Sequence, residues 1–63
     1  MTQKELLYIE DAIGHECSMI SILEDSISTL DDNKLISFMK KELNMHNTLK
    51  EKLMNVLEKK ANE

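Results

Sequence analysis

Apolar residues recur along most of this chain in steps that alternate between three and four residues. Such spacing places them on one side of an α-helix, which has about 3.6 residues per turn. The pattern forms two blocks separated by the polar segment Asp31-Asp32-Asn33. We therefore predict an all-α fold with one domain over residues 1–63, a two-helix antiparallel hairpin. Its helices are expected at about 3–29 and 33–60, joined by a turn at 30–33.

Capping signals mark both predicted helix starts. Thr2-Gln3-Lys4-Glu5 has the form of a capping box, in which the first and last side chains bind each other's backbone N–H groups. Asp31-Asp32-Asn33 supplies an N-cap for the second helix. Near the end of that helix, Lys59 and Lys60 suit the negative end of the helix dipole.

Each predicted inner stripe, the side of a helix that faces the other helix, is apolar except at a few positions. In the first helix the stripe is Leu6, Ile9, Ile13, Glu16, Ile20, Leu23, Ile27 and Leu30. In the second helix it is Leu35, Met39, Glu42, His46, Leu49, Leu53 and Val56. A turn near residue 32 pairs positions whose numbers sum to about 65, which puts Glu16 about one helical turn from the height of His46. Glu16, Glu42 and His46 are therefore expected near one another inside the hairpin.

The second helix is apolar over a wider arc than one neighbouring helix covers. A chain of 63 residues also buries little core by itself. Two hairpins packed as a four-helix bundle would cover the arc. We therefore predict a homodimer whose interface includes the residues beside the inner stripe, Ile36, Phe38, Leu43, Met45 and Leu57.

Glu16, Glu42 and His46 allow two interpretations at this stage. Glu and His residues that meet inside a four-helix bundle are the ligands of di-metal carboxylate sites, and iron, manganese or zinc suits them. The spacing from Glu42 to His46 is four residues, however, whereas those sites use three. Buried polar residues also set the register and oligomeric state of helical bundles. Glu16 can alternatively bury its stem while its carboxylate reaches water.

Composition and charge narrow the classes of function. The chain carries a net charge of −4, contains Lys but no Arg, and has only two aromatic residues, which argues against nucleic-acid binding. Residues 1–33 are acidic and residues 34–60 are basic, so the two helices should attract each other. The chain has no nucleophile–base pair, glycine-rich phosphate loop or Cys-x-x-Cys motif, so we expect no enzyme activity.

Cellular context is predicted from the single cysteine and from hydropathy. A lone Cys17 fits a reducing compartment, and we expect it to pack beside the inner stripe. No run of about 18 apolar residues and no signal peptide is visible. The expected protein is soluble and cytoplasmic, with no membrane partner.

Several short segments resemble small ferritin-like helical-hairpin proteins, the spore coat proteins of Firmicutes of the coat F type. The matching residues are Lys4-Glu5-Leu6, Ile9-Glu10-Asp11, His15-Glu16, His46 and Leu49. The resemblance implies a helical bundle, location in the spore coat, other coat or helical proteins as partners, and a degenerate metal site at Glu16 and His46.

The expected function is that of a non-enzymatic structural or assembly protein of spore-coat type, which acts through homodimerisation and needs no cofactor. One alternative is a metal-binding four-helix bundle that uses Glu16, Glu42 and His46. Another is a small adaptor or inhibitor that binds a different protein through the apolar face of the second helix.

Overall fold

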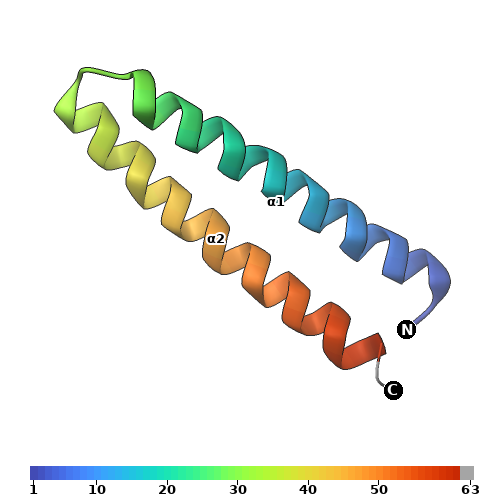
Figure 1. Cartoon of the computed structure of the whole chain (residues 1–63). Coiled ribbons are helices and arrows are strands. Elements are labelled where there is room, and N and C mark those ends of the chain that lie inside the picture. Colours follow the sequence, from blue (N-terminus) through green and yellow to red (C-terminus); the bar gives the residue numbers. More distant parts are fainter. Residues whose placement is uncertain (62–63) are drawn as a thin grey trace.

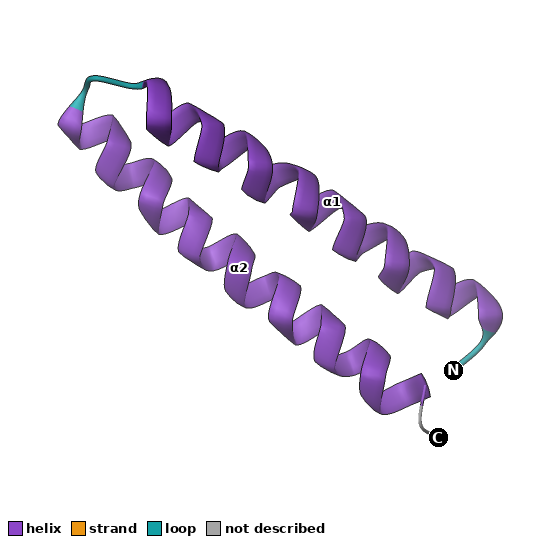
Figure 2. Cartoon of the chain, in the orientation of Figure 1, coloured by secondary structure: helices purple, strands orange, loops and turns teal. Residues whose placement is uncertain are grey.

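The chain folds into two long antiparallel helices joined by a tight turn (Figure 1). Helix α1 spans Gln3–Thr29 and helix α2 spans Asn33–Ala61, with loop in the described residues before α1 and at the turn (Figure 2). This computed structural model describes residues 1–61, and the molecule measures 47 × 14 × 11 Å. The predicted all-helical hairpin and its helix boundaries are confirmed.

Local side-chain contacts begin both helices where the sequence predicts. At α1, the Glu5 N–H donates to Thr2 Oγ1 (3.1 Å) and the Thr2 N–H donates to Glu5 Oε1 (2.9 Å). The hydrogen bond from the Thr2 backbone is the main reason that the pKa of Glu5 lies below its ordinary value. At α2, Asp32 Oδ1 accepts hydrogen bonds from the N–H groups of Lys34 (2.9 Å) and Leu35 (3.1 Å). These contacts satisfy N–H groups that a helix leaves unpaired in its first turn.

The inner stripe of α1 is confirmed. Glu16, Ile20 and Leu23 are buried, and the other predicted members are part-buried. The remaining α1 positions are mostly polar, so the sequence offers a single way to turn this helix toward its neighbour.

The inner stripe of α2 differs from the prediction. Leu35, Leu49 and Val56 were expected inside but are 42%, 44% and 44% exposed. The part-buried positions that recur every three or four residues are Ile36, Met39, Leu43, His46, Lys50, Leu53 and Leu57. The helix is therefore turned about its axis relative to the expected orientation.

The cost of burying the Glu42 carboxylate accounts for this rotation. In the predicted orientation its carboxylate would lie inside among aliphatic side chains of α1, which is costly without a hydrogen-bond partner. The observed rotation puts Leu43 inside and moves Glu42 to the edge, where it stays part-buried. Lys50 enters the inner stripe in exchange, and its long aliphatic stem can pack while its amine reaches water.

The register also differs slightly from the expected one. Only Leu30, Asp31 and Asp32 separate the helices, so the turn centres on residue 31 rather than near residue 32. Positions at equal height therefore have numbers that sum to about 62. Glu16 and His46 consequently lie side by side instead of one turn apart.

The rotation gives the hairpin one apolar and one polar face. Residues directly before inner-stripe positions are mostly apolar in α2 and half apolar in α1, and residues directly after them are mostly polar in both helices. The two helices are related by an approximate twofold axis normal to the hairpin plane. Residues that directly precede inner-stripe positions therefore lie on one face in both helices, and residues that directly follow them lie on the other. The apolar face comprises Tyr8, Ala12, Met19, Ile22, Leu35, Phe38, Met45, Leu49 and Val56.

Gly14 provides a test of helix energetics, because a methyl group added there would meet nothing within 4 Å. We predict that Gly14→Ala stabilises the protein by about 1 kcal/mol, or roughly 4–8 °C in melting temperature for a domain of this size. Circular dichroism melts at a fixed protein concentration measure it. Ser21→Ala, at an exposed position of the same helix, is the control and should gain about half as much. Equal melting temperatures for the Gly14 variant and the parent would contradict an unhindered helical site.

Candidate functional site

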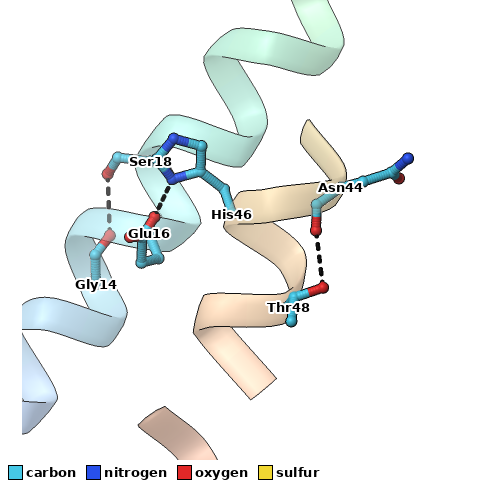
Figure 3. A network of polar contacts seen from close by, with 6 residues as sticks. All are labelled: Gly14, Glu16, Ser18, Asn44, His46 and Thr48. Atoms are coloured by element: carbon cyan, nitrogen blue, oxygen red, sulfur yellow. Dashed lines mark hydrogen bonds and ion pairs between the residues drawn. The ribbon is translucent and has the colours of Figure 1, made fainter. Parts of the chain in front are cut away.

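A histidine and a glutamate meet between the helices at the middle of the hairpin. His46 extends from α2 toward α1, and its Nδ1 lies in hydrogen-bond contact with Oε2 of Glu16 (Figure 3). The other hydrogen bonds drawn there, from Ser18 to Gly14 and from Thr48 to Asn44, stay within one helix. Glu16 and His46 therefore connect helices that otherwise meet through apolar contacts in this region.

Burial is uneven within the pair. The Glu16 side chain is 7% exposed and the His46 side chain 24% exposed. A carboxylate accepts hydrogen bonds, so in this contact Glu16 Oε2 is the acceptor that an N–H at Nδ1 of His46 would satisfy. Nε2 of His46 has no hydrogen-bond partner among the described residues. This second nitrogen is the part of the pair that remains available to another group.

His46 also borders the apolar face. A surface hollow is lined by Met45, His46 and Leu49, so the imidazole edge lies beside two exposed apolar side chains. Anything that covers the apolar face at mid-height would therefore also cover His46.

The donors of one chain do not fit a metal site. Among the described residues, no three His, Cys, Asp or Glu side chains gather closely enough to hold a metal ion. Glu42 stays apart from Glu16 and His46 because the rotation of α2 places it on the apolar face. Bound metals such as zinc take three or four protein ligands, and one hairpin brings together only two.

The predicted interface residues of α2 divide into two groups. Phe38 and Met45 are 57% and 64% exposed on the apolar face, whereas Ile36, Leu43 and Leu57 are part-buried in the inner stripe. Sequence reasoning missed the contribution of Leu35, Leu49 and Val56 to this face. Adjacent apolar pairs such as Leu35-Ile36 and Val56-Leu57 were the signal in the sequence, because either member of each pair could face α1.

Cys17 is exposed, which contradicts its predicted packing beside the inner stripe. It follows Glu16 directly and therefore lies on the polar face, to which α1 contributes other residues such as Glu10 and Glu24. His15 is also exposed.

No protein-family model, no curated protein and no solved structure matches this chain. Across the described residues, neither helix is both long and apolar enough to cross a membrane. Function must therefore be argued from the Glu16–His46 pair and the apolar face.

The Glu16–His46 contact predicts an asymmetric pair of single-variant effects. His46→Leu leaves a buried carboxylate without its partner, which costs about 1–3 kcal/mol or more. Glu16→Leu leaves a more exposed imidazole and should cost less. The double variant should melt above both single variants and at or above the parent, because two leucines restore a continuous apolar stripe.

Melting temperatures of all four proteins at one concentration complete this double-mutant cycle. Additive losses in the double variant would mean that the two side chains stabilise the fold independently, in disagreement with the contact.

Proposed function

We propose that this protein is a non-enzymatic structural module of spore-coat type that works by pairing with a second copy of itself. The observation that supports this proposal is the apolar face, which no part of the described chain covers. Five large side chains on α2, Leu35, Phe38, Met45, Leu49 and Val56, are each at least 42% exposed there. Large apolar side chains that gather on one exposed face commonly mark an interaction site.

The exposed area supports a pairing role. A compact protein of 7.3 kDa is expected to expose about 4,200 Å². This chain exposes 4998 Å², which is about 800 Å² more, the area that each partner of a standard interface buries. The excess reflects a flat, two-helix layer whose thickness is only 11 Å. A second hairpin laid on the apolar face would complete a four-helix bundle.

The small core supports the same conclusion. Among the described residues, only Ile20 and Leu23 are buried hydrophobic side chains. A folded domain must offset a conformational entropy cost of about 1–2 kcal/mol per residue for the backbone alone. Dimerisation would bury further apolar side chains and so enlarge this small core.

Removal of two apolar side chains tests the interface. We predict that Phe38→Gln with Met45→Gln raises the dimer dissociation constant more than about 100-fold, since four partly exposed side chains per dimer lose a contribution of up to roughly 1.5–3 kcal/mol each. Glutamine is neutral, so the result does not depend on how charges meet in the dimer. Sedimentation or light scattering across a concentration series gives the constant.

Leu7→Gln is the matched control, because Leu7 is 54% exposed but lies off the apolar face. It should leave the dimer intact. A parent protein that stays monomeric, near 7.3 kDa at micromolar concentration, would refute the proposed function. It would favour the adaptor alternative, in which a different protein occupies the apolar face.

A second candidate function is metal binding between two hairpins. The observation that favours it is Nε2 of His46, which points away from Glu16 while Nδ1 is held by that carboxylate (Figure 3). Metal-binding histidines are commonly oriented in this way by a carboxylate on the second nitrogen. Two copies would supply two such imidazoles, and iron, manganese or zinc suits the available ligands.

Metal content by mass spectrometry of the purified, untagged protein tests this candidate. Binding predicts about one or two ions per dimer, lost in His46→Gln, which removes Nε2 as a ligand. Glu10→Gln, an exposed carboxylate on the polar face, should retain the metal. A dimer that takes up no iron, manganese or zinc on titration would rule the candidate out and leave the assembly role unaffected.

A further inference from the structure

The apolar face of α2 has an internal symmetry that bears on how a second copy sits. Between Phe38 and Val56 the face reads Phe38, Glu42, Met45, Leu49, Lys52 and Val56, and Leu35 precedes this stretch. The stripe has the same order of apolar and charged positions from either end, centred near residue 47, and the two charges are opposite. We call these six residues the self-complementary stripe.

Two twofold arrangements can cover the apolar face with a second hairpin. An axis parallel to the helices places α1 over the partner's α2, with both turns at one end. An axis perpendicular to the helices and parallel to the hairpin plane places α2 antiparallel over the partner's α2, with the turns at opposite ends. The apolar side chains find apolar neighbours in both arrangements, so the charged members of the face decide between them.

Glu42 and Lys52 distinguish the arrangements. Glu42 is part-buried in the middle of the apolar face and has no hydrogen-bond or ion-pair partner in the described chain. In the parallel-axis dimer its height matches residue 20 of the partner, where the face of α1 offers Met19 and Ile22. A carboxylate covered by these apolar side chains would lose its hydration without compensation.

With the perpendicular axis at mid-height, residues of α2 whose numbers sum to about 94 meet across the interface. This sum pairs Glu42 with Lys52 of the partner subunit, and the partner's Glu42 with Lys52. It also pairs the apolar residues of the stripe, Phe38 with Val56 and Met45 with Leu49. Such reciprocal contacts are what an isologous interface requires.

Helix α1 is compatible with the same axis. Its apolar face residues pair reciprocally about nearly the same height, Tyr8 with Ile22 and Ala12 with Met19, and His15 lies at the axis opposite its own copy. The acidic residues of α1 mostly lie elsewhere, since Glu10 and Glu24 directly follow inner-stripe positions and occupy the polar face. Like charges of the two α1 helices therefore stay largely outside the contact.

We infer that the second copy packs with its α2 antiparallel over the first, held in this orientation by two Glu42–Lys52 ion pairs. This inference rests on the proposed dimer and adds its orientation. It also brings the two Glu16–His46 pairs together at the centre of the bundle, because both lie within about one residue of the axis height.

Charge reversal tests the orientation. Glu42→Lys and Lys52→Glu each place like charges together twice per dimer and should raise the dissociation constant about 10-fold or more. The double variant should return to within about 3-fold of the parent. An equimolar mixture of the two single variants should form mainly heterodimers, in which every pair is attractive again.

Lys40→Glu and Glu51→Lys are the matched controls, because both residues lie on the polar face of the same helix. Neither should change the dissociation constant, and their mixture should show no preference for heterodimers. A dimeric parent whose double variant is not rescued would overturn the orientation but leave the dimer standing. A monomeric parent would overturn both.

Spin labels at the turn provide a second, independent measurement. With Asp31→Cys in a Cys17→Ser background, the inferred dimer separates the two labels by nearly the 47 Å length of the molecule. The parallel-axis dimer would bring them within about 20 Å, since packed helices lie about 8–10 Å apart. Labels on native Cys17, at mid-height, should give similar distances in both arrangements and serve as the control. A short distance at the turn would overturn the inference.

Discussion

The contact between Glu16 and His46 sets the geometry of the hairpin. Aliphatic side chains on two long helices can slide or rotate past one another at little cost, because hydrophobic attraction is not directional. A buried carboxylate instead needs a donor at one place. Placing His46 beside Glu16 fixes the register of the two helices, while the cost of burying Glu42 favours the observed rotation of α2. Buried polar pairs often add little net stability, so the contribution of this pair lies in selecting one arrangement.

Once the rotation of α2 is set, the two faces of the hairpin follow. Residues directly before the inner stripe become the apolar face, and residues directly after it become the polar face. Phe38 and Met45 are consequently exposed to water although their helix packs along its whole length against α1. Phe38 and Met45 directly precede the inner-stripe residues Met39 and His46, so they lie beside the contact between the helices and not inside it.

Sequence reasoning succeeds where local interactions decide and fails where a choice between tertiary contacts decides. Thr2, Glu5 and Asp32 cap helices through neighbours within three residues, so both helix starts were predictable. The inner stripe of α1 was predictable because few other apolar positions compete with it. In α2, Leu35-Ile36 and Val56-Leu57 each offer two candidates one residue apart, and periodicity alone cannot rank them. The decisive term was the cost of burying Glu42, which depends on the side chains of the other helix. The positions of Glu16, Glu42 and His46 also depend on contacts between the helices. Their spacing placed all three on the inner stripes and did not show that Glu42 turns away.

The polar residues of this small protein then divide into two sets with related tasks. Glu16 and His46 meet within one chain and align its helices. Glu42 and Lys52 remain on the apolar face of the same chain, equally spaced about its middle, where they can be satisfied only from outside. A face made only of Phe38, Met45, Leu49 and similar residues would accept a second copy in several orientations, because apolar contact discriminates weakly between them. One acid and one base on such a face penalise every orientation that leaves the acid covered and unpaired. We therefore propose that this hairpin, whose described residues bury only two hydrophobic side chains, gains a specific partner from charges that contribute little to its own stability.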